Sequence, residues 1–162
     1  MRRMQKIQKT IPFTSAKYKE MQQKVVELTQ LREEVMKRLI TAREMGDLSE
    51  NGAYQYAKFE LGDIGRQLRR FKSLLAKGFQ APKNVGLKGV IDFGSTVTVE
   101  KINQSKKQLT FMIVSEHESD PSKGTLAYSS PMGKALLRKK VGDSVTVKTP
   151  VGETEYVIIN IS

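Results

Sequence analysis

The first 80 residues place their apolar side chains at helical spacing. Between about Ser15 and Glu44 these side chains recur every three or four positions, which puts them on one face of a helix. The members of this stripe are Tyr18, Met21, Val25, Leu28, Leu31, Val35, Leu39 and Ala42. Thr14 stands just before it and can cap the helix, because its hydroxyl can accept a hydrogen bond from the first turn. The pattern predicts one long helix.

A second stripe starts at Tyr54 with a stricter rhythm. Steps of three and four residues alternate through Tyr54, Ala57, Leu61, Ile64, Leu68, Phe71 and Leu75. Such a heptad repeat is typical of a coiled coil. Gly46 lies between the two stripes and suits the left-handed backbone conformation that often ends a helix. We therefore expect the two helices to form a hairpin.

An antiparallel hairpin can be tested by pairing the two stripes. As one helix ascends the other descends, so the residue numbers of facing pairs must add up to a nearly constant value. One register satisfies this for seven pairs: Leu75 with Tyr18, Phe71 with Met21, Leu68 with Val25, Ile64 with Leu28, Leu61 with Leu31, Ala57 with Val35, and Tyr54 with Leu39. The sequence thus predicts an antiparallel coiled coil with arms about 45 Å long. This is longer than a small domain needs for stability and suggests that the hairpin extends to a distant site.

Beyond Pro82 the hydrophobic period becomes two, as in β-strands. Apolar residues alternate at Val97 and Val99, at Leu109, Phe111 and Ile113, at Val145 and Val147, and at Val157 and Ile159. Ser130 followed by Pro131 is a good helix start, so a short helix is expected to about Lys139. The predicted fold class is α+β, with a coiled-coil hairpin at residues 1–80, a linker at 81–93, and a β-rich domain with one short helix at 94–162.

Composition narrows the function. The formal charge is +11, and residues 1–80 carry 17 Lys and Arg against 9 Asp and Glu, which favours a polyanionic partner for the hairpin. The chain has no cysteine and one histidine, which excludes disulfides, a thiol nucleophile and a stable zinc site. No apolar run of membrane-spanning length and no secretory signal is visible. We expect a soluble, cytoplasmic protein.

Few residues can carry chemistry. The single histidine, His117, lies in a polar segment and is expected to be a solvated loop residue, so no catalytic triad can form. Asp47 and Glu50 stand three residues apart between the two stripes. Their spacing fits a capping box at the start of the second helix. It equally fits two oxygen donors that share a hard cation such as Mg²⁺ with another macromolecule. Both interpretations remain open, since a carboxylate has several lone pairs.

A basic cluster occupies the second helix. Its members are Arg66, Arg69, Arg70, Lys72 and Lys77, with Asp63 as the only local acid. Of these, Arg66, Arg69 and Arg70 share an exposed face at three- and four-residue spacing. The cluster is either a solvated helix face or a surface for an anionic ligand.

Two segments resemble a known family. Residues 42–54, Ala-Arg-Glu-Met-Gly-Asp-Leu-Ser-Glu-Asn-Gly-Ala-Tyr, are similar to the tip motif of the GreA/GreB transcription elongation factors. Residues 129–137, followed by Val141-Gly142-Asp143 and by residues 149–153, resemble the FKBP-like C-terminal domain of the same family. The resemblance covers about residues 10–161.

The resemblance implies how the protein works. The coiled coil would enter the secondary channel of RNA polymerase, and the C-terminal domain would dock on the channel rim through Ser130, Pro131 and Met132. Asp47 and Glu50 match the paired acids of the tip, which would share Mg²⁺ with the polymerase active site and orient the water that attacks backtracked RNA near its 3′ end. Residues Arg66, Arg69 and Arg70 would hold that RNA.

By the same resemblance the chain is not itself an enzyme. It would stimulate cleavage by the polymerase, bind no cofactor when free, avoid membranes and act as a monomer. One position departs from the family pattern: Ala53 stands where an acidic residue usually precedes the tip tyrosine, Tyr54. A role for a third tip carboxylate is therefore not implied here, and the seam position of Tyr54 favours packing over contact with substrate.

Three other functions fit parts of the sequence. A channel-binding regulator or inhibitor of polymerase without cleavage activity would share the fold. A prolyl isomerase is suggested by the FKBP-like segment, but few aromatics and no tryptophan are available to line its pocket. A coiled-coil adaptor or general nucleic-acid binder would bind free RNA in a strongly salt-dependent manner.

Overall fold

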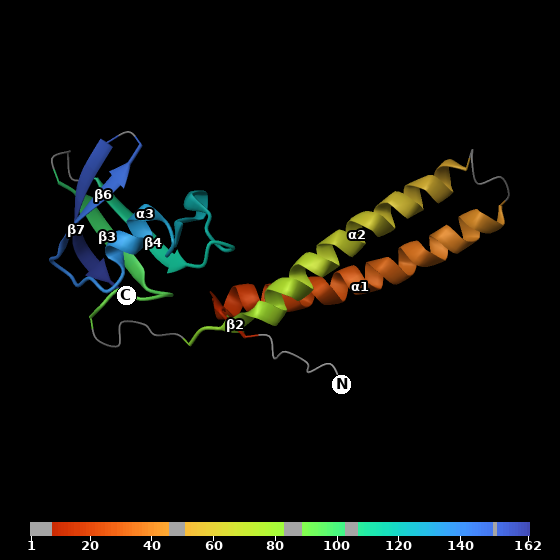
Figure 1. The fold of residues 1–162 in the computed structure, drawn as a ribbon, viewed down its shortest axis with the longest axis horizontal. Coiled ribbons are helices and arrows are strands. Elements are labelled where there is room, and N and C mark those ends of the chain that lie inside the picture. Colours follow the sequence, from red (N-terminus) through yellow and green to blue (C-terminus); the bar gives the residue numbers. More distant parts are fainter. Residues whose placement is uncertain (1–7, 46–50, 83–88, 103–106, 151) are drawn as a thin grey trace. The chain divides into compact units, whose positions relative to one another are not determined.

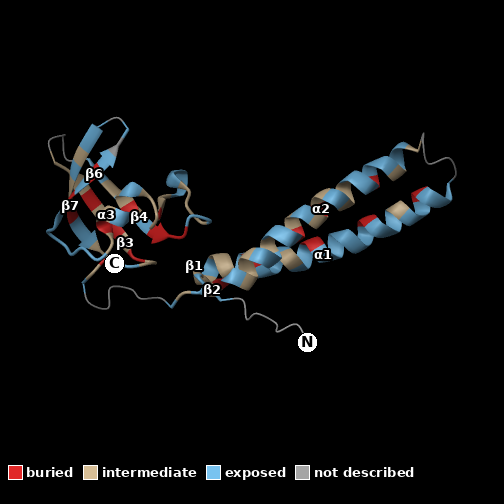
Figure 2. Cartoon of the chain, in the orientation of Figure 1, coloured by how far each residue is buried: buried red, intermediate tan, exposed pale blue. Residues whose placement is uncertain are grey.

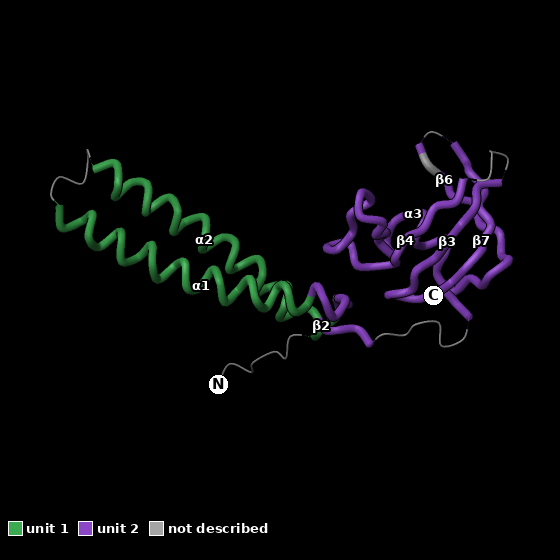
Figure 3. Tube along the Cα trace, turned by 180° about the vertical axis from the view of Figure 1, so that it is seen from behind, with its two compact units in different colours: residues 1–10, 18–78 green, residues 11–17, 79–162 purple. Residues whose placement is uncertain are grey.

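The computed structural model describes residues 8–45, 51–82, 89–102, 107–150 and 152–162. The chain divides into two compact units, one formed by residues 1–10 and 18–78, the other by residues 11–17 and 79–162 (Figure 3). Neither long helix of the described residues is apolar enough to cross a membrane.

Three α-helices, one 3₁₀ helix and seven strands make up the described chain (Figure 1). In chain order they are β1 (Ile11–Phe13), α1 (Ser15–Glu44), α2 (Gly52–Lys77), β2 (Gly78–Gln80), β3 (Thr96–Lys101), β4 (Gln108–Val114), the 3₁₀ turn η1 (Pro121–Lys123), β5 (Thr125–Ala127), α3 (Pro131–Leu136), β6 (Ser144–Thr149) and β7 (Gly152–Ile161). The prediction of a long helical hairpin followed by a β-rich domain with one short helix is confirmed.

The hairpin packs through the predicted seam. Its core contains Leu28, Val35, Ala57, Ile64 and Leu68, with Val25, Leu39, Leu61 and Phe71 partly buried beside them. These residues belong to the facing pairs derived from the antiparallel register. Along both helices the buried positions recur on one side, and the remaining surface is mostly exposed (Figure 2). Leu31 is the least buried member of its stripe, at 37% exposure.

The start of α1 is capped as the sequence predicts. The hydroxyl of Thr14 accepts a hydrogen bond from the Lys17 amide at 3.2 Å. Glu118 adds to this cap within the second unit, because its two carboxylate oxygens accept from the Thr14 amide at 2.8 Å and from the Thr14 hydroxyl at 2.6 Å. The expectation that His117 is a solvated loop residue is confirmed: it is an exposed residue of a turn, and its ring centroid lies 6.1 Å from that of the buried Phe13.

The second unit is built on a five-stranded sheet in the order β5-β4-β3-β7-β6. All neighbours are antiparallel except β4 and β5, which run parallel. The fully buried part of the core includes Ile91, Val97, Ile113, Leu136 and Ile158. Leu136 places α3 against this core, so the short helix covers the sheet.

The strand pattern differs from the sequence prediction in β7. The predicted inward residue Ile159 is 40% exposed, and its neighbour Ile158 is buried. A register shift between Thr98 and Val99 of β3 explains the change: Thr98 pairs with Asn160, whereas Val99 pairs with Ile158, so Ile159 is skipped. The extra residue of such a bulge reverses which side chains face the core.

The short helix is also shorter than predicted, ending at Leu136 rather than Lys139. Its continuation is diverted by Ile91, whose carbonyl accepts a hydrogen bond from the Arg138 amide and whose amide donates to the Lys139 carbonyl. Arg138 reaches this position with a φ of 65°. Ile91 belongs to the segment expected to be linker, and its side chain is fully buried in the domain core.

Candidate functional site

Asn51 organises the described ends of the two helices. Its side-chain oxygen accepts a hydrogen bond from the Tyr54 amide at 3.1 Å, and its side-chain nitrogen donates to the Ala42 carbonyl at 2.6 Å. The first bond caps α2, and the second ties the last turn of α1 to the start of α2. One side chain therefore holds both helix ends that flank residues 46–50.

The N-cap of α2 tests whether the acidic pair forms a capping box, one of the two interpretations that the sequence leaves open. Asn51 occupies that position, so the interpretation of Asp47 as the cap of this helix is wrong. Asp47 and Glu50 themselves lie outside the described residues. In the sequence both acids precede the 26-residue helix α2.

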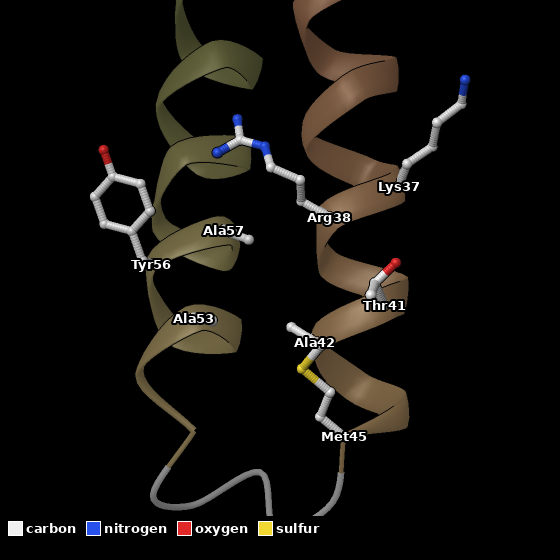
Figure 4. Close-up of a pocket in the computed structure, with 8 residues that line it drawn as sticks. All are labelled: Lys37, Arg38, Thr41, Ala42, Met45, Ala53, Tyr56 and Ala57. Carbon is white, nitrogen blue, oxygen red and sulfur yellow. The ribbon is translucent and has the colours of Figure 1, made fainter.

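A hollow of about 390 Å³ lies beside these helix ends. Figure 4 shows its walls: Lys37, Arg38, Thr41, Ala42 and Met45 from α1, and Ala53, Tyr56 and Ala57 from α2. Arg38 crosses toward α2, and its Nη2 atom lies 3.1 Å from both carboxylate oxygens of Glu60. Ala53, which departs from the family pattern, is an exposed wall residue, and Tyr54 is half-buried.

Two residues that line the hollow, Met45 and Tyr56, are highly exposed, as is Phe59 one turn beyond Tyr56 on α2. Met45 is 75% exposed, and Tyr56 and Phe59 on the first turns of α2 are 65% and 72% exposed.

The predicted basic patch is exposed on α2, but its three arginines do not share one environment. Arg66 and Arg69 line a groove between α1 and α2, together with Arg32 and Lys72. Arg70 is exposed and is not part of this groove lining. Arg66 also forms a 3.1 Å ion pair with Asp63 on the helix surface.

Lys72 is a member of the basic cluster predicted from the sequence, whereas Arg32 was not identified from the sequence as part of this surface. Lys72 belongs to the same helix as the predicted patch, one turn beyond Arg69. Arg32 comes from α1, and the antiparallel register could have located it, because it faces the level of Leu61. The hydrophobic pattern of either helix alone contains no such signal.

The proposed docking residues of the C-terminal domain have different environments. Ser130 caps α3, since its hydroxyl accepts from the Gly133 amide at 3.0 Å and donates to the Ala127 carbonyl at 2.7 Å. Met132 is half-buried and packs against the core. Pro131 is exposed at the first turn of α3. The cap thus fixes the turn that presents Pro131.

No metal cage is found in the part of the chain that the structure describes. No group of three or more acidic or histidine side chains converges there. Asp47 and Glu50 supply two oxygen donors of the kind that Mg²⁺ prefers, whereas Mg²⁺ takes six ligands. Two donors leave most of those six positions unfilled, so the acidic pair alone is not a complete Mg²⁺ site.

Comparison with known proteins gives matches across the chain. The family described as "Transcription elongation factor, N-terminal" matches residues 11–78, and "Transcription elongation factor, GreA/GreB, C-term" matches residues 86–162. Transcription elongation factor GreA of Pelobacter propionicus is 37% identical over 153 residues, which cover 94% of this chain and 96% of the relative. The GreA factor of Trichlorobacter lovleyi is 39% identical over 155 residues, covering 93% and 96%.

A solved structure gives a further likeness. The GreA factor homolog 1 (Gfh1) protein of Thermus thermophilus is 27% identical, with 94% of this chain and 98% of that chain covered and a TM-score of 0.43.

Proposed function

Since the chain belongs to the GreA/GreB family of transcription elongation factors, we propose that it inserts its hairpin into the secondary channel of RNA polymerase and stimulates cleavage of backtracked RNA. The observation that carries the proposal is the position of Asp47 and Glu50. They lie between two antiparallel helices of 30 and 26 residues. An arm about 45 Å long can bring two carboxylates into a narrow channel without admitting the rest of the protein.

The two acids act at the polymerase active site. Mg²⁺, when held there, supplies Lewis-acid stabilisation of the phosphodiester and a more acidic bound water. Asp47 and Glu50 contribute oxygen ligands and accept a proton or hydrogen bond from the attacking water. Because Asn51 caps α2, neither carboxylate is needed for that cap, which leaves both for this role.

The remaining contacts position the arm and the RNA. The basic face with Arg66, Arg69 and Arg70 holds the extruded strand, since guanidinium groups bind phosphate oxygens through paired donors. Pro131 and the exposed part of Met132 dock on the channel rim, with Ser130 fixing their turn. The protein is then a monomeric partner of polymerase with no complete active site of its own.

The test uses stalled, backtracked elongation complexes with and without the protein. We expect the wild-type chain to shorten the RNA and release 3′ fragments. Asp47→Asn removes one negative charge and leaves the N-cap Asn51 in place, so it should fold with wild-type thermal stability and still compete for polymerase. Its stimulation of cleavage should collapse.

Two outcomes oppose the proposal. Full cleavage by a folded Asp47→Asn protein would remove the catalytic assignment of the acids. A wild-type protein that occupies polymerase without any cleavage would instead identify a channel-binding regulator or inhibitor.

A further inference from the structure

Asn51 is followed by a glycine, and this pair of residues can react with itself. The backbone nitrogen of Gly52 can attack Cγ of the Asn51 side chain and close a five-membered succinimide ring. The proton of that nitrogen leaves with the side-chain amino group as ammonia, and water then opens the ring to an aspartyl or an isoaspartyl residue. Glycine favours the attack, because it has no Cβ atom beside the attacking nitrogen. Asn51-Gly52 is the one Asn-Gly pair in the sequence.

The folded hairpin holds Asn51 out of the reactive geometry. Its backbone is extended, with a φ of −79° and a ψ of 93°. At this ψ the Gly52 nitrogen and the Asn51 Cβ atom lie on opposite sides of the Cα–C bond, whereas ring closure needs them on the same side. The chain must therefore turn about this bond before it reacts, which moves the Asn51 side chain relative to the first turn of α2 and breaks the cap.

Two hydrogen bonds stabilise the unreactive arrangement. The Oδ1 atom of Asn51 accepts from the Tyr54 amide at 3.1 Å, and Nδ2, the nitrogen that would leave, donates to the Ala42 carbonyl at 2.6 Å. The second bond joins α2 to α1, so it exists only while the ends of the two helices are together. The rate of ring closure therefore depends on how often these ends open.

The pair lies where local opening is easy. Asn51 is half-buried and Gly52 is exposed. Gly52 is the first residue of α2, so its N–H has no acceptor within that helix. Helix ends open at a lower free energy than the buried centre of a helix.

From these features we propose that Asn51 is a self-modification site controlled by the hairpin. Each opening of the helix ends exposes Asn51-Gly52 to succinimide formation, and closing of the ends protects the pair. The change is permanent, because ammonia is lost. It requires only water besides the chain itself.

The product replaces an amide with a carboxylate. A carboxylate can still accept from the Tyr54 amide, but it cannot donate to the Ala42 carbonyl. The aspartyl product therefore keeps the cap of α2 and loses the link to α1. The isoaspartyl product also adds a methylene group to the backbone, which displaces the cap. Both products place a further carboxylate directly after Glu50 in the sequence.

The experiment follows conversion of Asn51 in the isolated full-length protein, so its result does not depend on polymerase. Wild-type protein is incubated at mildly alkaline pH, either folded or unfolded in guanidinium chloride. Peptide mapping by mass spectrometry measures the mass increase of the Asn51 peptide, and an isoaspartyl methyltransferase labels the isoaspartyl product. The other asparagines, Asn84, Asn103 and Asn160, precede Val, Gln and Ile and serve as internal controls.

Three variants separate the reaction from the opening that permits it. Gly52→Ala puts a methyl group beside the attacking nitrogen, where a Cβ atom would meet nothing within 4 Å. Gly65→Ala makes the same change farther along α2, also in open space, and leaves the reactive pair intact. Leu39→Ala removes a partly buried seam side chain near the end of α1, which increases the population of open ends.

We expect Asn51 to convert first among the asparagines of the wild-type protein. Unfolded protein should convert it at least about tenfold faster than folded protein, because closed ends no longer protect it. Leu39→Ala should convert it about fivefold faster than wild type. Gly52→Ala should convert it at least about fivefold more slowly, whereas Gly65→Ala should stay within about twofold of wild type.

Each part of the proposal has a result that overturns it. Equal rates in folded and unfolded protein, or in Leu39→Ala and wild type, would show that the hairpin does not control the site. A wild-type rate in Gly52→Ala would show that the Gly52 nitrogen is not the attacking atom. Earlier conversion of another asparagine would remove the assignment to Asn51.

The effect of the product is tested with Asn51→Asp. Hydrogen exchange of the Tyr54 amide should stay at the wild-type rate, because aspartate caps a helix as well as asparagine does. The Met45 amide donates to the same Ala42 carbonyl at 3.3 Å in the last turn of α1. Its exchange should become about fivefold faster when the link is lost. Unchanged exchange of Met45 would overturn the assigned effect on α1.

Discussion

At the scale of single residues, Asn51 shows how one side chain can serve two helices. Its amide is both acceptor for the Tyr54 N–H and donor to the Ala42 carbonyl. A carboxylate or a hydroxyl at this position could cap α2, but a carboxylate could not donate and a hydroxyl is too short to span both helices. The link keeps the arm ends together next to the acidic pair.

Replacing Asn51 should loosen the helix ends in a graded manner. Asn51→Ala loses both hydrogen bonds and should cost about 1 kcal/mol of hairpin stability. Asn51→Ser keeps a capping hydroxyl and should lose less. Hydrogen exchange of the Tyr54 amide measures the cap directly: we expect faster exchange in Asn51→Ala and nearly wild-type exchange in Asn51→Ser. Identical exchange in both variants would contradict the assigned cap.

Gly133 is required for steric reasons in the second unit. A Cβ atom there would lie 2.1 Å from the Ala127 carbonyl oxygen and 2.9 Å from the Tyr128 Cα, and both are backbone atoms. Backbone cannot move aside as the end of a flexible side chain can. Gly133 therefore allows α3 to lie directly on the chain that leaves β5.

Gly133→Ala should destabilise the second unit by about 1–3 kcal/mol, the usual cost of overpacking. Gly65→Ala is the matched control, since the same added methyl meets open space on α2 and should stabilise the hairpin by about 0.5–1 kcal/mol. Thermal denaturation followed by circular dichroism would report both. An unchanged melting profile for Gly133→Ala would show that α3 can shift away from β5.

At the scale of elements, the hairpin depends on a narrow seam. Val35 is completely buried in the seam, while Val26 on the same helix is 50% exposed. The two valines share helix and chemistry and differ in what surrounds them. Most of the outward surface can therefore serve contacts with partners at little cost to folding.

Truncating these valines should separate packing from helix propensity. Val35→Ala should lower hairpin stability by about 2 kcal/mol, because it removes buried methyl groups and leaves a cavity. Val26→Ala removes the same atoms from a half-exposed site and should be within about 0.5 kcal/mol of wild type. Thermal melting at 222 nm compares them. Similar losses in both variants would mean that the seam is not the main source of hairpin stability.

At the scale of the whole molecule, the two units differ in how they are built. The first consists of the long arm, with its charge and exposed apolar residues. The second is a sheet-based domain with a conventional core, and it includes residues 11–17, which contain the buried Phe13 and the capped Thr14. The chain thus enters α1 from within the second unit.

The free protein should bind Mg²⁺ only weakly. Two carboxylates leave most of the octahedral shell to water, and no acidic cluster converges among the described residues. Isothermal titration calorimetry should detect no binding tighter than about millimolar. Stoichiometric binding at micromolar Mg²⁺ would contradict a metal shared with polymerase.

The sequence by itself determined the elements that depend only on residues close together along the chain. Heptad spacing is a property of consecutive turns, so α1 could be predicted with its bounds, and Thr14 and Ser130 could be identified as caps. The antiparallel register could also be predicted, because the residue numbers of facing pairs add up to a nearly constant value. The acidic pair, the basic patch and the family resemblance were all visible in residue identity and spacing.

Tertiary structure decided what depends on a partner distant in sequence. The bulge opposite Thr98 and Val99 reversed the inward side of β7, because strand parity is set by the neighbouring strand. Ile91 entered the core and shortened α3 through hydrogen bonds to a segment nearly 50 residues away. Asn51 took the cap because its position lets it reach Ala42. Arg32 joined Arg66 and Arg69 only when two helices were laid side by side. Each of these outcomes depends on what lies opposite a residue, and local spacing does not contain that information.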